Sequence, residues 1–480
     1  MRKLYYLLLL CVLLQISCSH VLDEPYDSRV ELSALSDYRA LLSQAYPERQ
    51  DLFTDILTDD YHHYAGSIQA NLIPTYVPLY LWEDDYEEGV RATPAAAYAH
   101  YYEKIYLANT VIAEVMKTQG ETVEKEALLG EALCVRAYAY FSLVNLFSKH
   151  YNVQTSGSDP GVPLILDVPT ESKPSFHRAT VAQVYEQIES DMKQGQQLME
   201  KNATFLSANP YHFSLASVYA FFCRLYLYQE KWEQCISYAD RSLQISGGQI
   251  RDLTADIQVW KSYDIAYFAQ EFMNPATHKN ILLASQSESF LTRPTGFRLC
   301  GFYPSHQLYY GFPKNDLRFG LFSAGGTVID SITNYVKYAQ QPNQPNVGVA
   351  RYECFTNEEV LLNRAEALLK QTVPNRMAAL ETVEQLRKKR ITPFSILDAS
   401  TLSLEELEDL VLDQRRKEFL GQGMRWYDIK RLGLSVSHRL VRTSPTPDAV
   451  LTADDPRKAI QIPLTARIGN PVLENELNPR

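Results

Sequence analysis

The stretch from Ser214 to Leu243 constrains the fold more than any other part of the chain. It predicts two short helices joined at Gln229–Lys231, because apolar side chains recur at intervals of three and four on both sides of this joint. Large side chains alternate with small ones, at which two helices can approach closely: Tyr219, Phe222 and Tyr226 are large, and Cys223, Cys235, Ala239 and Ser242 are small. Such a pair cannot bury its apolar faces alone, so we expect further pairs to stack on it.

Two other parts of the chain have a similar pattern. Glu358–Leu369 with Arg376–Leu386 forms one candidate pair, and 121–147 with 180–199 forms another that an insertion splits. The spacing and the sizes of the side chains resemble tetratricopeptide repeats. The sequence therefore predicts a mainly α-helical fold, a short solenoid of tetratricopeptide-like helix pairs. Helical periodicity also runs through Asp37–Asp60 and Ala95–Lys117, and Thr180 marks the expected start of a helix.

Helical periodicity is missing from two regions rich in aromatic residues. One is Tyr61–Tyr86, which contains Pro74 and Pro78, and the other runs from about Asp252 to Val349. Connections this long are uncommon unless they are functional or disordered, and their aromatic content argues against disorder. We therefore expect long, irregular, ligand-binding loops on a helical scaffold.

The first residues predict export and a lipid anchor. A basic start and an apolar run over Leu4–Leu14 are typical of a signal peptide, here residues 1–17. Cys18 follows a sequence that resembles a bacterial lipoprotein cleavage site, so residues 18–30 are interpreted as the lipidated cysteine and its tether. An ordinary signal peptide followed by an incidental cysteine is the alternative. The rest of the chain divides into an N-terminal region, 31–250, with the helix pairs and a C-terminal region, 251–480, with the loop insertions.

The other cysteines have no spacing typical of a zinc site, and most are expected to be small core residues. Cys223 and Cys235 fall at small positions of one helix pair, so we expect their side chains to touch at the crossing of the two helices. Free thiols and a disulfide both remain open.

The densest run of charge lies between Asp413 and Gly433. The formal net charge of the chain is −11, so a nucleic-acid patch is a poor interpretation of this run. Glu418 continues an apolar stripe and needs a cationic partner, for which Arg415, Arg416 and Arg425 are the nearest candidates. Gly421 and Gly423 permit a tight turn. Beyond the turn, a second short helix would pair its own charges, and the segment is interpreted as structural, through Arg415, Arg416, Glu418, Arg425, Trp426, Asp428 and Arg431.

The same run resembles a family signature. "RRKEFLGQGMRWYDIKRLG" is similar to the C-terminal signature of the SusD/RagB family of outer-membrane nutrient-binding lipoproteins. Other stretches that resemble the family follow in its order, among them "YEKIYLANTVI", "LLGEALCVRAYAYFSLVNLF", "GVPLIL" and "RYECFTNEEVLLNRAEALL". The chain departs from the signature at Gln414, Leu420 and Gln422.

This resemblance implies a protein without catalytic activity, anchored at the cell surface. Such a protein caps a SusC-like TonB-dependent transporter in the outer membrane and delivers oligosaccharides, glycans or sometimes peptides to it. A secreted glycoside hydrolase and a solenoid that binds only proteins are the competing classes. No G-x-S-x-G, H-E-x-x-H or P-loop motif is present in the sequence.

Recognition of a sugar needs flat aromatic faces beside hydrogen-bonding groups. Both aromatic regions supply them, and Trp82 and Tyr303 are the first choices, because a neighbouring turn-forming or charged residue should hold each ring near the surface. The alternative is that these rings pack the loops onto the helices. The other candidates are Tyr76, Tyr80, Phe302, Tyr309, Tyr310, Asp59, Asp60, His62, Asn71, Arg298 and His306.

Asp59–His63 also invites a metal-site interpretation. Adjacent histidines point in different directions on a regular helix or strand, so the segment is interpreted as polar residues of an exposed binding loop instead. No cofactor is predicted, and a calcium site built from scattered loops cannot be derived from sequence.

Overall fold

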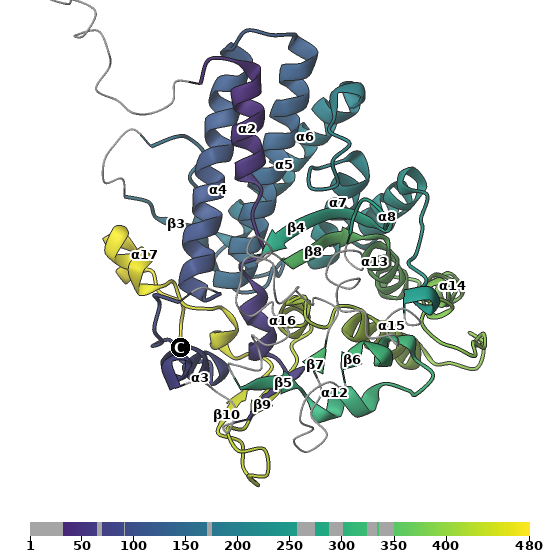
Figure 1. The fold of residues 1–480 in the computed structure, drawn as a ribbon. Helices are drawn as coiled ribbons and strands as arrows, with labels where there is room; N and C mark the ends of the chain where they lie inside the picture. The colour runs from purple at the N-terminus through teal and green to yellow at the C-terminus, as the bar shows by residue number, and fades with distance from the viewer. Residues whose placement is uncertain are drawn as a thin grey trace, which may run out of the picture.

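The computed structural model of the chain describes residues 32–64, 70–90, 92–169, 175–256, 274–287, 301–323, 334–335 and 350–480. Within these residues the chain is mainly helical, with short sheets between the helices (Figure 1). The fold class predicted from the sequence is confirmed.

Four helices form a bundle at one end of the molecule: α2 (Leu35–Ala45), α4 (Pro94–Glu114), α5 (Thr122–Phe147) and α6 (Val181–Lys201) (Figure 1). Helix α6 begins where Thr180 predicts. The Thr180 hydroxyl accepts a hydrogen bond from the Gln183 backbone N–H, and the Gln183 side chain accepts one from the Thr180 N–H. Helix α5 packs against both α4 and α6.

Helix α5 is long and apolar enough to cross a membrane by its length and composition, and it is the one such helix in the described part of the chain. Within its most apolar window, 94% is buried inside the protein. Its central position in the bundle therefore accounts for its apolar character.

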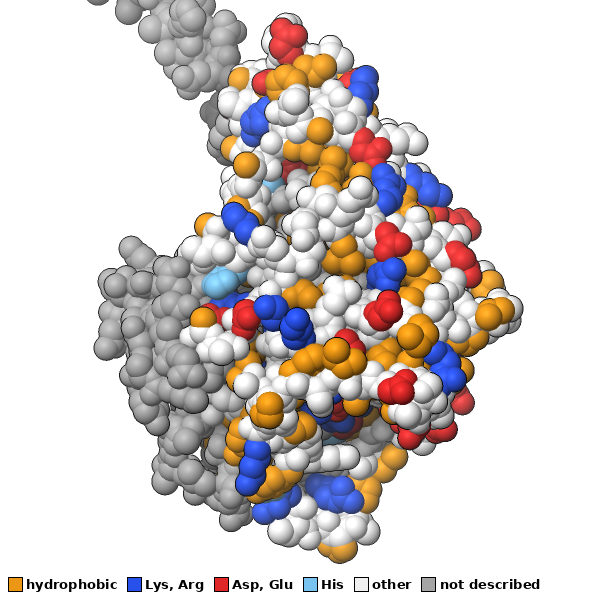
Figure 2. Space-filling model, turned by 90° about the vertical axis from the view of Figure 1, so that its right-hand side faces the viewer, with side chains coloured by type: hydrophobic (Ala, Val, Ile, Leu, Met, Phe, Trp, Pro, Cys, Tyr) orange, Lys and Arg blue, Asp and Glu red, His pale blue; other side chains and the backbone are white. Residues whose placement is uncertain are grey.

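The predicted helix pairs are confirmed and stack on one another. Helix α7 (Leu215–Tyr228) is followed by α8 (Trp232–Ser246), and α13 (Asn357–Lys370) by α14 (Arg376–Arg387). Helix α13 packs against both α7 and α8, which joins the two pairs. Figure 2 shows the side of the molecule that lies to the right in Figure 1, where acidic, basic and apolar side chains are intermixed.

Cys223 and Cys235 meet where α7 crosses α8, as predicted. Both side chains are fully buried, and their Sγ atoms lie 3.6 Å apart as free thiols. Their contact confirms the register of this helix pair.

The described strands form antiparallel pairs. They are β1 (Tyr61–His63) with β5 (Phe302–Pro304), β2 (Pro160–Pro163) with β3 (Arg178–Thr180), β4 (Ile281–Ser287) with β8 (Ala350–Thr356), β6 (Phe322–Ser323) with β7 (Asn334–Tyr335), and β9 (Val436–His438) with β10 (Ala449–Leu451). Short helices complete the fold: α3 (Ile73–Tyr80), α12 (His306–Gly311), α15 (Leu404–Glu418), α16 (Met424–Arg431) and α17 (Leu464–Gly469).

Two local predictions need correction. The helix expected over Asp37–Asp60 is interrupted between Ala45 and Leu52, where Pro47 lacks the N–H that a helix interior needs. The stretch expected to be irregular contains α3. Pro74 sits in the first turn of α3, where a missing N–H is harmless, and Pro78 lies near its end.

The segment 413–433 forms the end of α15, a tight turn and α16. Gly421 and Gly423 have φ angles of +77° and +70°, and a β-carbon on Gly423 would lie 2.6 Å from the Thr54 Oγ1 atom. Both glycines are therefore required by the turn, as predicted. Trp426, in the first turn of α16, is fully buried.

Arg415 and Arg431 hold Asp428 between them. The Arg415 Nε atom lies 2.9 Å from one carboxylate oxygen of Asp428, and the Arg431 Nε atom lies 2.8 Å from the other. The expected pairing of Arg431 with Asp428 within α16 is confirmed. Arg425, in contrast, points away from Asp428 and pairs with Asp59, at 2.9 and 3.0 Å.

Glu418 is held by residues that the sequence interpretation did not consider. Its partners are Arg318 at 3.1 Å and Arg390 at 2.7 Å, and not Arg415, Arg416 or Arg425. The prediction failed because those three arginines face α16, α13 and the loop at Asp59, whereas Glu418 faces the end of α14.

Candidate functional site

The structure brings the two predicted loop regions together. Strand β1, from the first region, pairs with β5, from the second, and His62 lies opposite Tyr303 in the register. Helix α12 follows directly after β5. The Ser305 hydroxyl caps the N-terminus of this helix by accepting a hydrogen bond from the Leu308 N–H. Side chains separated by more than 230 positions in sequence thus share one surface.

A row of rings lies on this surface. His62 and His306 contact each other edge to face with ring centroids 5.2 Å apart, and the His306 ring contacts Tyr310 in the same way at 5.9 Å. Tyr310 contacts Tyr309 at 5.2 Å. Arg442, from the loop between β9 and β10, places a guanidinium nitrogen 3.4 Å from Nδ1 of His306. We call His62, His306, Tyr309, Tyr310 and Arg442 the histidine–tyrosine surface.

Tyr310 is the most open member of the row. Its side chain is 66% exposed, whereas Tyr309 is half-buried against Phe319 and Phe322. With two thirds of its surface open to solvent, this ring can be reached by a ligand. An aromatic face with polar groups at its rim suits a molecule that is apolar across its rings and polar at its edge.

His62 is neutral at pH 7. Burial, and then the electrostatic effect of His306 and Arg442, lowers the pKa of His62 to about 4. The Nε2 atom of His62 is buried, so a ligand would reach this imidazole through Nδ1. Arg442 adds guanidinium N–H donors beside it.

Trp82 and Tyr80 have a different role from the one predicted. The ring of His438 stacks between them, with ring centroids 3.9 Å from Tyr80 and 4.1 Å from Trp82. The Trp82 Nε1–H donates to the Leu57 carbonyl, and its side chain is only 6% exposed. The prediction that Trp82 lies at the surface is wrong, because β9 brings His438 against it.

Three further rings are buried. Phe302 packs against His63 and Tyr80. Tyr76, a residue of α3, is fully buried. Tyr303, the other first choice, is 7% exposed and lies beside Tyr64. These rings attach the loops to the helices, as the competing interpretation expects. The prediction that these three rings contact a ligand is therefore wrong, and they belong to the core.

Asp59 and Asp60 are occupied by the 413–433 segment. Arg425 and Arg416 both pair with Asp59, and the Arg416 Nε atom lies 2.6 Å from Asp60. Burial opposes the charged form of Asp59, but the hydrogen bond from Arg425 and the charge of Arg416 outweigh it and lower the pKa of Asp59. Both carboxylates therefore stabilise the fold through these ion pairs, and the prediction that they bind a ligand is wrong.

The remaining candidates stay predictions. His62, Tyr309 and Tyr310 lie on the histidine–tyrosine surface, and Asn71 is exposed just before α3. Arg298 and Cys18 lie outside the described residues.

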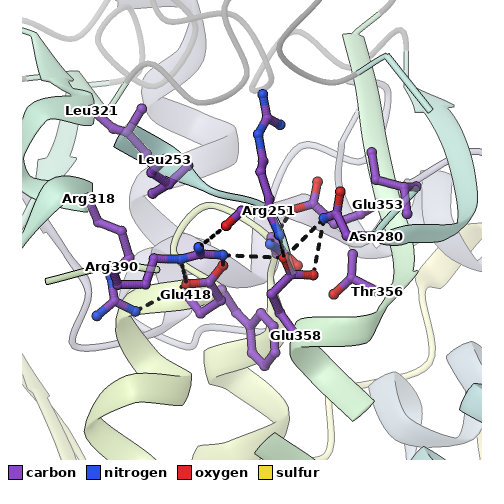
Figure 3. Close-up of a pocket in the computed structure, with 13 residues that line it drawn as sticks. Arg251, Leu253, Asn280, Arg318, Leu321, Glu353, Thr356, Glu358, Arg390 and Glu418 are labelled. Atoms are coloured by element: carbon purple, nitrogen blue, oxygen red, sulfur yellow. Dashed lines mark hydrogen bonds and ion pairs between the residues drawn. The ribbon is translucent and has the colours of Figure 1, made fainter. Parts of the chain in front are cut away.

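A cavity of about 30 Å³ near the end of α15 is the strongest rival site (Figure 3). Arg390 points into it between two carboxylates, 2.7 Å from Glu418 and 3.4 Å from Glu358 (Figure 3). Arg318 is held by Asp316 at 2.7 Å as well as by Glu418. The charges satisfy one another in a space about the size of one water molecule, so the cluster stabilises the fold.

Arg442 is the site residue that the sequence did not reveal. It lies in a polar stretch between two strands too short to show periodicity, 136 positions after His306. An exposed arginine beside prolines and threonines was the only signal.

Comparisons with known proteins agree with this architecture. Residues 22–227 match a family model described as starch-binding, associating with outer membrane, and residues 332–466 match the model of the SusD family. A SusD-like protein of Formosa agariphila is 24% identical over 87% of this chain and 87% of its own length.

Solved structures share the fold at low sequence identity. A SusD superfamily protein from Bacteroides thetaiotaomicron superposes with a TM-score of 0.72 at 20% identity, covering 93% of this chain and all (100%) of that one. A putative sugar binding protein from Bacteroides vulgatus has a TM-score of 0.71 at 21% identity, covering 94% of this chain and 99% of that one.

Proposed function

The chain belongs to the SusD/RagB family, and we propose that it binds oligosaccharides at the cell surface and passes them to a SusC-like TonB-dependent transporter of the outer membrane. Binding and release require no bond to be broken, so the proposed role is not catalytic. The names of its relatives, which include a sugar-binding protein, support carbohydrate as the ligand class.

The observation that carries this proposal is the exposed ring of Tyr310 beside His306, His62 and Arg442. One face of a sugar ring would stack on Tyr310. Its hydroxyl groups would then meet the guanidinium of Arg442 at the edge of the ring.

Tyr310→Ala is expected to weaken oligosaccharide binding at least about fivefold, because a ring contact contributes about 1 kcal/mol. Calorimetric titration with a panel of oligosaccharides measures the affinity. The melting temperature should hardly change, since the side chain is 66% exposed. Tyr106→Ala is the matched control, because Tyr106 is an exposed tyrosine (46%) on α4.

Equal affinity of the Tyr310 and Tyr106 variants would move the site away from the histidine–tyrosine surface. Binding of peptides but not of oligosaccharides would replace the proposed ligand class. New reducing ends after incubation with a glycan would contradict the absence of catalysis.

We further propose that lipid on Cys18 anchors the protein, because each buried methylene adds roughly 0.8 kcal/mol of membrane affinity. Cys18→Ala should move the protein from the membrane fraction to the soluble fraction, or stall its processing. Cell fractionation followed by immunoblotting measures this. A variant that still sediments with the outer membrane would exclude the anchor.

A further inference from the structure

A second hollow, of about 330 Å³, lies where the ends of α5 and α16 meet the segment after β10. It shares no lining residue with the histidine–tyrosine surface. Lys149, Lys430 and Lys458 line it, together with His150, Asp159 and Asp455. We call it the lysine hollow.

Lys430 is buried in this hollow without a carboxylate partner. Its side chain belongs to α16, and the residue is 8% exposed. The Nζ atom donates to two carbonyls at the C-terminal end of α5, those of Asn145 and Ser148, the latter at 2.7 Å. An ammonium group has three donors, so one remains for another acceptor.

Lys458 is a second buried cation of the same hollow. It is 6% exposed, and its Nζ atom donates to the Ala453 carbonyl at 2.5 Å. No carboxylate in the described structure lies within ion-pair distance of either lysine. Two donors of Lys458 therefore remain.

The carboxylates that line the hollow pair with cations other than Lys430 and Lys458, or are exposed at its rim. Asp159 pairs with Lys149 at 2.7 Å, and Asp455 pairs with Arg457 at 2.7 Å. Asp454 and Glu230 are exposed to solvent. Arg431, also in the lining, is neutralised by Glu366 and Asp428.

Burial and neighbouring cations lower the pKa of Lys430 and of His150, and burial lowers the pKa of Lys458 although Asp454 and Asp455 oppose it. Burial, and then repulsion by Lys458, lowers the pKa of Lys430 to about 7. Burial, and then the charges of Arg431 and Lys430, lowers the pKa of His150 to about 3. An anion between the lysines would offset this repulsion and satisfy the remaining donors.

We propose that the lysine hollow binds an oxyanion, a phosphate, sulfate or carboxylate group, between Lys430 and Lys458. The hollow is roomy enough for such a group and opens to solvent. The oxyanion has two sources, a free inorganic ion or an acidic substituent on a bound glycan.

The test is calorimetric titration with sodium sulfate, sodium phosphate and an oligosaccharide containing glucuronate, each against chloride of equal ionic strength. At least one of them should bind the wild type saturably. Lys458→Gln should bind it at least about tenfold more weakly. Lys388→Gln is the control, because Lys388 is an exposed lysine directly after α14, and this variant should bind as the wild type does.

A second readout is proton uptake on binding of sulfate or the glucuronate oligosaccharide, neither of which titrates near pH 7.5, measured in two buffers of different ionisation enthalpy. The anion should raise the pKa of Lys430, so binding should take up protons in the wild type and not in Lys430→Met. Melting curves show whether each variant is folded.

Saturable binding of inorganic sulfate or phosphate that depends on Lys458 would assign the hollow to a free ion. Binding of the glucuronate oligosaccharide alone, again dependent on Lys458, would assign it to an acidic glycan. No binding beyond that of chloride, or unchanged affinity in Lys458→Gln, would overturn the proposal.

Discussion

Trp426→Ala should lower the free energy of unfolding by about 3–5 kcal/mol, because it deletes a large, fully buried aromatic side chain. Trp426 lies in the first turn of α16 and borders the same cavity as Leu57 and Trp82. This is a large part of a typical stability of about 5–15 kcal/mol. Chemical denaturation followed by circular dichroism measures the change.

Trp426→Phe is the matched control. The indole Nε1–H of Trp426 makes no hydrogen bond in the described structure. Trp426→Phe therefore reduces the volume of the side chain without removing a polar contact. It should retain most of the stability. If alanine and phenylalanine were equally harmless, Trp426 would not support the fold, and the structural interpretation of 413–433 would fail.

Arg390→Met should cost about 3–5 kcal/mol of stability, because it leaves buried carboxylates without their main cation. Arg390 is 1% exposed and holds Glu418 at 2.7 Å and Glu358 at 3.4 Å, and Arg318 also contacts Glu418 (Figure 3). The double variant Arg390→Met with Glu418→Gln should be less destabilised than the sum of the single variants, since it removes both charges.

The loss in Arg390→Met should also depend on pH. Burial already raises the pKa of Glu358 despite the attraction of Arg390, and removing Arg390 would raise it further. The folded variant would then bind more protons than the unfolded chain, so its stability relative to the wild type should fall as pH rises from about 5 to 8. A loss independent of pH would show that packing, and not charge, is what Arg390 contributes.

Most helices were predictable because each element bears its own signal. Thr180 caps α6 through its own hydroxyl, and the alternation of large and small residues in α7 and α8 set the contact between Cys223 and Cys235. Helix α3 was missed because proline usually ends a helix. Pro74 and Pro78 nevertheless fall where the lost hydrogen bonds matter little.

The ligand site was predictable in region but not in residue. Aromatic content pointed to two segments, and the structure joins them through β1 and β5. Which rings stay exposed depends on partners far away in sequence. His438, which covers Trp82 and Tyr80, lies more than 350 positions further along the chain. Arg416, which pairs with Asp60, lies 356 positions after it.

The partners of the charged residues in 413–433 were also predictable only in part. Its glycine turn and the pair of Asp428 with Arg431 are local, and both were predicted. The partners of Glu418 come from the ends of other elements, which spacing along one helix cannot show.

Hydroxyl-radical footprinting of the wild type, with and without an oligosaccharide that binds saturably, tests the proposed ligand site most directly. It reads the protection of each side chain from oxidation without any substitution. The ligand should protect Tyr310 and His306 and leave the exposed ring of Tyr106 on α4 unchanged. Protection confined to other surfaces, with Tyr310 oxidised as fast as in the free protein, would contradict the assignment of the histidine–tyrosine surface.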